Sequence, residues 1–333
     1  MNKKFDIIGI GNAIVDILAR TDDDFLATEN LIKGSMSLID EQRAQHIYKV
    51  MRSTKIVSGG SAANTIVGAT MLGARTGFIG KVRDDELGHI FVHDLNSIGV
   101  HYQTPLAQQG SATACCYVLV TPDGERTMNT YLGASQNLTE DDIDVNLISQ
   151  TSIVYLEGYL WDPPQAKKAF LKAADCIHTQ DGQVAFTLSD QFCVDRYRDE
   201  FCNLLKDQKI DILFANEHEL KSLFATENIN IALSEIQSLV SLAAITCSAE
   251  GSIIVTRETI EQCPVFPINE LIDTTGAGDL FAAGFLTGLT KDMDLRDCAR
   301  LGSIAAAEII QHIGARPERD LKSMAQENGL LNL

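Results

Sequence analysis

Short apolar segments alternate with longer segments of helical period along most of the chain. This alternation favours a mostly parallel sheet with helices on both faces. Strands that read as continuous apolar runs also fit a sheet that is covered on both sides. We expect strands at 5–10, 76–79, 153–156, 184–188, 210–214, 243–247 and 252–256, and helices at 62–72, 87–98, 165–174, 196–206 and 217–224.

Two stretches interrupt this alternation, at 14–40 and 98–130. Both hold strand-like pieces without long helices between them, and Thr121–Gly124 forms a strong turn signal between the last two pieces. We expect a small antiparallel β-sheet built from these two insertions, which is a candidate lid. The predicted α/β fold then has a large domain at 1–13, 41–97 and 131–333, and a discontinuous lid domain at 14–40 and 98–130.

Composition narrows the class of protein. The chain has 333 residues, of which 45% are hydrophobic and 22% charged, so it is neither a disordered chain nor a collagen or coiled coil. It lacks an apolar run of the ~18 residues that a membrane helix needs. The first residues lack the apolar run and cleavage site of a secretory signal, so we expect a cytoplasmic protein.

The net charge and the cysteine content limit the classes of partner that the protein is expected to have. The net charge of −18 repels polyanions, which makes nucleic acid an unlikely partner. The eight cysteines are scattered, which is typical of reduced thiols in a cytosolic protein. We therefore expect small-molecule ligands, and neither a nucleic acid nor a membrane.

Two common phosphate-binding motifs are absent. Gly9 and Gly11 follow a strand, but the third glycine of a dinucleotide fingerprint would fall on Ile14. Gly80-Lys81 is followed by Val82, so the chain holds no P-loop. A dinucleotide oxidoreductase and a P-loop enzyme are both disfavoured.

The segment Asp273–Asp279 contains the candidate catalytic residues. It reads D-T-T-G-A-G-D and leads into a helix of small and apolar residues. Small residues at a helix N-terminus leave backbone N–H groups open to an anion. Asp279 would sit beside that anion, where it could take a proton from an attacking hydroxyl. The alternative is an N-terminal aspartate that is favoured by the helix dipole alone.

This segment resembles the C-terminal signature of the PfkB (ribokinase-like) carbohydrate and nucleoside kinase family. Gly59–Asn64 resembles the N-terminal glycine-rich segment of that family, Phe78–Gly88 its following strand and turn, and Asn216–Glu219 its N-x-x-E element. The resemblance spans nearly the whole chain and is nearest to adenosine-kinase-like bacterial members. It implies a ribokinase-like fold, with a doubly wound sheet and a small β lid.

The resemblance also implies roles for single residues in phosphoryl transfer from ATP. Asp279 is then the catalytic base, and Glu219 holds Mg²⁺ through water. Backbone N–H groups of Gly276, Ala277 and Gly278 form the anion hole. Asp273 and Thr275 lie where some relatives hold a monovalent cation such as K⁺. The nucleotide-binding residues are Asn216, Thr246, Ser248, Gly251 and Ala305, with Ser248 replacing a glycine of the family pattern.

The acceptor side is expected at the lid. Arg126 resembles the arginine that reaches the phosphates in adenosine kinases, with a solvated hairpin arginine as the alternative. Tyr159 and Trp161 could stack on a purine or belong to the core. The expected substrate-binding residues are Asn12, Asp16, Met36, Gly59, Gly60, Asn64 and Tyr159.

Together these observations predict an ATP-dependent kinase that phosphorylates a primary hydroxyl of a nucleoside, adenosine first. A ribokinase- or fructokinase-type free-sugar kinase is the alternative enzyme. A catalytically inactive sugar or nucleoside sensor on the same fold is the alternative of another class. The chain would be a monomer or a homodimer.

Overall fold

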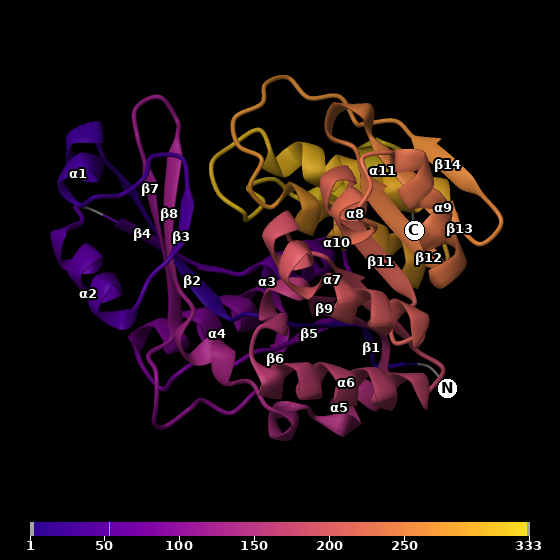
Figure 1. The fold of residues 1–333 in the computed structure, drawn as a ribbon, viewed down its shortest axis with the longest axis horizontal. Helices are drawn as coiled ribbons and strands as arrows, with labels where there is room; N and C mark the ends of the chain where they lie inside the picture. The colour runs from indigo at the N-terminus through magenta and orange to yellow at the C-terminus, as the bar shows by residue number, and fades with distance from the viewer. Residues whose placement is uncertain (1–2, 53, 332–333) are drawn as a thin grey trace.

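The larger of two sheets forms the centre of the molecule (Figure 1). The computed structural model describes residues 3–52 and 54–331. In order across the sheet, the strands are β14 (Ile260–Cys263), β13 (Ser252–Thr256), β12 (Leu242–Thr246), β11 (Ile212–Asn216), β10 (Gln183–Thr187), β9 (Thr151–Glu157), β1 (Phe5–Ile10), β5 (Thr76–Ile79) and β6 (His101–Tyr102). Neighbouring strands pair in parallel from β6 to β12, whereas β13 and β14 are antiparallel.

Helices cover both faces of this sheet, as the apolar strands predicted. In β1, Ile7 packs into one hydrophobic cluster, while Ile8 and Ile10 pack into the other. The first cluster lies under α3 (Ser61–Met71), α4 (Glu86–Ile98), α10 (Ala277–Thr290), α11 (Leu295–Ile309) and α12 (Leu321–Glu327). The second lies under α5 (Val145–Ser149), α6 (Pro164–His178), α7 (Gln191–Lys206), α8 (Glu217–Leu223) and α9 (Ile229–Leu239). The predicted doubly wound α/β fold is confirmed.

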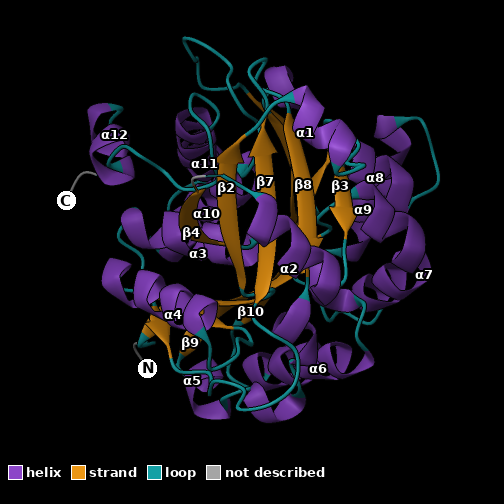
Figure 2. Cartoon of the chain, turned by 90° about the vertical axis from the view of Figure 1, so that its left-hand side faces the viewer, coloured by secondary structure: helices purple, strands orange, loops and turns teal. Residues whose placement is uncertain are grey.

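The second sheet stands apart from the first and forms the lid (Figures 1 and 2). Its strands are β3 (Met36–Leu38), β8 (Arg126–Tyr131), β7 (Ala114–Val120), β2 (Ile14–Arg20) and β4 (Thr54–Gly59) in that order. The sheet is mixed rather than antiparallel, because β2 pairs with β7, and β3 with β8, in parallel. Helix α1 (Asp23–Thr28) and helix α2 (Glu41–Val50) belong to this layer, and Ile47 of α2 packs on Ile17 and Tyr117.

The two layers divide the chain differently from the sequence-based division. Residues 41–50 and 54–59 belong to the lid layer, although the sequence placed 41–97 in the large domain. Residues 101–102 pair with β5 of the large sheet, although 98–130 were assigned to the lid. Residues 1–2, 53 and 332–333 of the expected ranges lie outside the described residues. Strand β4 pairs with β2, a partner about 40 residues earlier that no local pattern reveals.

All eight cysteines are free thiols, as expected. Within residues 3–52 and 54–331, no helix is both long enough and apolar enough to cross a membrane.

Candidate active site

A cleft of about 1570 Å³ separates the inner face of the lid from the large sheet. The ends of several parallel strands open into it, with Asn12 after β1, Glu157 in β9, Asn216 in β11 and Thr246 in β12. Ligands of open α/β sheets bind at these carboxyl ends, outside the sheet. The cleft therefore lies where the fold favours a ligand site.

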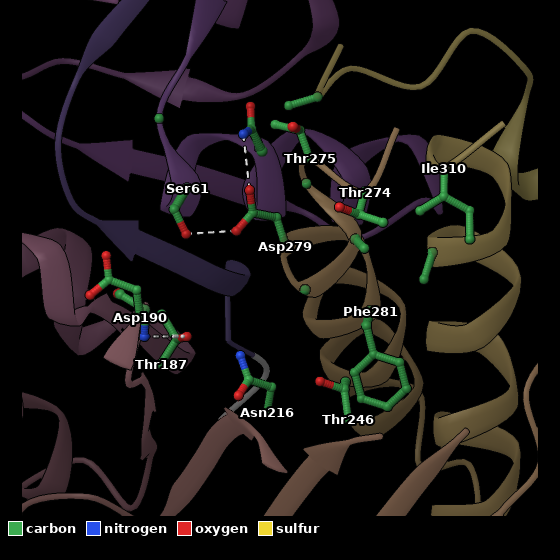
Figure 3. Close-up of a pocket in the computed structure, with 18 of the residues that line it drawn as sticks. Ser61, Thr187, Asp190, Asn216, Thr246, Thr274, Thr275, Asp279, Phe281 and Ile310 are labelled. Atoms are coloured by element: carbon green, nitrogen blue, oxygen red, sulfur yellow. Dashed lines mark hydrogen bonds between the residues drawn. The ribbon is translucent and has the colours of Figure 1, made fainter. Parts of the chain in front are cut away.

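Asp279 lies in the first turn of α10 and faces α3 (Figure 3). Its Oδ1 accepts a hydrogen bond from the Ser61 hydroxyl at 2.6 Å, and its Oδ2 accepts one from Nδ2 of Asn64 at 3.0 Å. Burial raises the pKa of Asp279, while these two donors act in the opposite direction. A carboxylate that is held in one orientation and made more basic suits proton abstraction from a hydroxyl.

The loop before α10 has the backbone of an anion site. Gly276 is the N-cap and has a φ of +79°, which glycine adopts without strain. The N–H groups of Gly278 and Asp279 lie in the first helical turn, where no earlier carbonyl of the helix can pair with them. Ala277 differs from the prediction, because its N–H donates to the Thr274 carbonyl at 3.1 Å.

Two glycines at the end of β4 allow close contacts, one within the lid and one with the large domain. A Cβ on Gly59 would lie 2.3 Å from Oδ2 of Asp16, and one on Gly60 would lie 2.3 Å from the Asn12 carbonyl oxygen. Gly60 also has a φ of +95°. The glycine pair thus lets Asp16 reach the cleft. Burial there raises the pKa of Asp16 to about 6, against the nearby charges of Arg316 and Arg126.

Glu157 was missed by the sequence analysis. It is fully buried and accepts hydrogen bonds from N–H and Nδ2 of Asn12, at 2.7 and 2.6 Å, and from the N–H of Ala62 at 2.7 Å. Burial raises its pKa to about 7. A glutamate that ends an otherwise apolar strand was the signal available in the sequence. Asn12 is thereby fixed in place, and its Oδ1 accepts from Ser135 at 2.8 Å.

Arg126 extends from the lid to the loop before α10. It forms an ion pair with Asp273, and its Nη1 donates to the Thr275 hydroxyl at 2.7 Å. Asp273 also accepts from the N–H groups of Thr275 and Gly314, at 3.0 and 3.1 Å. A guanidinium therefore lies on the two residues where the family resemblance placed a monovalent cation.

The predicted nucleotide residues divide into two groups. Thr246, Ser248 and Gly251 line the cleft, and Ser248 keeps a left-handed φ of +51° where the family pattern has glycine. A Cβ on Gly251 would lie 2.1 Å from the Cys263 carbonyl oxygen. Ala305 does not fit the prediction, because it is buried in the first hydrophobic cluster; its neighbours Ala306 and Ala307 line the cleft instead.

Asn216 and Glu219 form a capping box at the start of α8. Both carboxylate oxygens of Glu219 accept from Asn216, at 2.9 Å from the backbone N–H and 2.5 Å from Nδ2. Burial raises the pKa of Glu219 to about 7, and the nearby charge of Asp190 adds to the shift. The described residues contain no cluster of three or more acidic, His or Cys ligands. One carboxylate in a cleft fits Mg²⁺ that keeps most of its waters, rather than a cage of protein ligands.

Comparison with known proteins decides the family. The profile of the "pfkB family carbohydrate kinase" matches residues 28–321. The chain belongs to the pfkB family. A solved adenosine kinase from Sinorhizobium meliloti is 46% identical, with a TM-score of 0.91 over 98% of this chain and 99% of that one. A probable sugar kinase from Rhizobium etli is 44% identical, with a TM-score of 0.92 over 99% and 100%. Adenosine kinase of Saccharomyces cerevisiae is 27% identical over 92% of this chain and 95% of that protein.

This pfkB kinase is therefore an ATP-dependent enzyme that acts on an alcohol. Of the aromatic residues considered for its acceptor side, Tyr159 lines the cleft with 39% of its surface exposed. Trp161 is 4% exposed, packs against Phe186 and Phe201, and donates to Glu200 at 2.8 Å. Trp161 therefore belongs to the second hydrophobic cluster.

Proposed function

We propose that this kinase phosphorylates the primary hydroxyl of a nucleoside, with adenosine as the first candidate. The observation that carries the proposal is the two-part lining of the cleft on its lid side. A polar group around Asp16, Asn64 and Asp279 adjoins an apolar group on the lid. The apolar group consists of Leu18, Met36, Leu38, Val118 and Met128. A free sugar would use the polar group alone, whereas a nucleoside also has an apolar base to bury.

The polar group suits a sugar ring. Oδ1 of Asn64 is buried and, among the described residues, has no hydrogen-bond partner. It can accept from a sugar hydroxyl, since an unpaired buried acceptor is costly. Asp16 offers two further acceptor oxygens in the same cleft. Asp279 then takes the proton of the attacking hydroxyl as the bond to the γ-phosphorus of ATP forms and the bond to ADP breaks.

Developing charge on the phosphoryl group has several supports. The N–H groups of Gly276 and Gly278 and the dipole of α10 favour an anion. Bound Mg²⁺, held through water near Glu219, would neutralise phosphate charge. Arg126 supplies positive charge beside Asp273, so we propose that this guanidinium takes the place of a monovalent cation. The compartment we propose is the cytoplasm.

The test is ADP release from ATP and Mg²⁺ by the purified protein, with adenosine, other nucleosides, ribose and fructose offered separately. The Asp279→Asn variant serves as the background control. Selective turnover with adenosine or another nucleoside would support the proposal. Turnover with free sugars alone would refute the nucleoside assignment, and it would mean that the apolar group has another use. Absence of turnover with every acceptor would favour the inactive sensor.

A further inference from the structure

Arg316 lies in the turn between α11 and α12, and this turn is held at both ends. At its start, the N–H of Gly314 donates to Oδ2 of Asp273 at 3.1 Å. At its end, Oε1 of Glu308 accepts from the N–H groups of Glu318 and Arg319, at 3.0 and 2.9 Å. Glu308 is only 1% exposed. These contacts fix where the side chain of Arg316 begins.

The guanidinium of Arg316 spans the junction of the lid and the large domain. Its Nε donates to the carbonyl of Ser58 at 2.9 Å, and its Nη2 donates to the Ser58 hydroxyl at 3.1 Å. Its Nη1 donates to the carbonyl of Ala63 at 3.1 Å. Ser58 belongs to β4 of the lid and Ala63 to α3 of the large domain. The residues between them include the glycine pair and Ser61, whose hydroxyl holds Asp279.

The charge of Arg316 acts on the same place. Carboxylates surround it from three elements, with Asp16 on β2, Asp94 on α4 and Asp279 on α10. Asp94 in turn accepts from the N–H of Ser58 at 3.1 Å. Burial lowers the pKa of Arg316 to about 10, so the guanidinium stays charged at neutral pH.

We propose that Arg316 is a positioning residue. It clamps the Gly59–Gly60 junction and thereby holds the carboxylates of Asp16 and Asp279 in place on the acceptor side of the cleft. Three directed bonds to two domains fix the angle at which β4 meets α3. Because Ser61 and Asn64 follow directly in α3, the same clamp fixes the donors that orient Asp279. The role in catalysis rests on the proposed function, whereas the clamp itself can be measured without an acceptor.

The kinetic test compares Arg316→Met with Arg316→Lys and with Arg319→Met. Arg319 is exposed and lies in the same turn, so its variant removes the same charge away from the cleft. For Arg316→Met, we expect the KM for adenosine to rise about 10- to 100-fold while the KM for ATP stays unchanged. Arg316→Lys keeps the charge but not the fork of donors, so it should show a smaller rise.

The pH profile separates positioning from folding. The charged groups that act on Arg316 are Asp16, Asp94 and Asp279. Arg126 acts in turn on Asp16, and Glu157 interacts with Asp279. Loss of the guanidinium raises the pKa of Asp16 and Asp279, so the acid limb of kcat/KM should move to higher pH in Arg316→Met. The limb should stay in place in Arg316→Lys and Arg319→Met.

Amide hydrogen exchange of the free protein gives a reading that needs no acceptor. Residues 59–64 should exchange faster in Arg316→Met than in wild type or Arg319→Met. Unchanged exchange there, or a KM for adenosine and a pH profile equal to those of Arg319→Met, would overturn the clamp. An equal rise in the KM for both substrates would overturn it too, since that indicates general loosening. If Arg316→Met does not fold, Arg316→Lys decides by the KM for adenosine and by the exchange of residues 59–64, because its pH profile is expected to match that of wild type. If the wild-type protein does not phosphorylate adenosine but residues 59–64 still exchange faster in Arg316→Met than in wild type, the nucleoside assignment is refuted and the clamp is retained.

Discussion

Asp16→Asn should make the protein more stable at neutral pH while it weakens acceptor binding. Burial raises the pKa of Asp16 from 3.8 to about 6. Because the folded-state pKa is the higher one, the stabilising contribution of the protonated carboxyl is complete below about pH 4 and is lost as the pH rises through about 6. Ionising Asp16 then costs the folded state about 3 kcal/mol above pH 7, and about half of that at pH 5.

Asparagine cannot ionise, so the substitution removes this cost. The free energy of unfolding of Asp16→Asn, measured by urea denaturation relative to wild type, should rise by about 1.5 kcal/mol between pH 5 and pH 8. Asp24→Asn is the matched control, because Asp24 is an exposed lid residue. A difference between Asp16→Asn and wild type that is constant or falls with pH would refute the reasoning. In the ADP-release assay, the KM of Asp16→Asn for the acceptor should rise, because an amide cannot accept from two hydroxyls with both of its polar atoms.

Three further predictions concern the catalytic and nucleotide sides. Asp279→Asn should lower kcat by about 10²–10⁴-fold in the ADP-release assay, and near-wild-type turnover would rule out the base. Replacing K⁺ by tetramethylammonium should leave wild-type turnover unchanged, because Arg126 already pairs with Asp273; Arg126→Met should introduce a response to K⁺, and a strong K⁺ requirement in wild type would contradict this assignment. Gly251→Ala should lower thermal stability and raise the KM for ATP, at a cost of about 1–3 kcal/mol. Gly110→Ala is its control, since Gly110 has a similar φ of +98° but open space around it; equal effects would show that the contact with Cys263 is unimportant.

The sequence predicted the elements that local pattern determines. Apolar runs such as 5–10 and 151–157 are buried on both faces of a parallel sheet, and the small-residue segment at 276–279 opens a helix. Thr139 and Asp142, three residues apart, form a capping box. These features depend on residues a few positions apart, so they can be read from one sequence.

The features that were missed depend on contacts between distant residues. Arg316 reaches Ser58 across 258 positions, and Glu157 reaches Asn12 across 145. Nothing local to either residue indicates those partners. The prediction for Ala305 was wrong for a geometric reason. Successive residues of α11 point in different directions, so Ala305 is buried whereas the next residue, Ala306, lines the cleft. Strand β4 was missed because its lid partner β2 lies in another segment of the chain.

The way the lid is attached limits how it can move. Within the described residues the chain crosses between lid and large domain four times, before β2, after β4, before β7 and after β8. These crossings are tied to one another in a row. Gly60 abuts Asn12, Asn12 accepts from Ser135, and the Ala112 carbonyl accepts from the N–H of Ala134. The lid sheet can therefore rotate about this row of contacts as about a hinge, whereas a translation of the lid along the large domain would break the contacts. Closing over a ligand would then order no long loop, so little conformational entropy is lost and more of the contact energy remains as affinity.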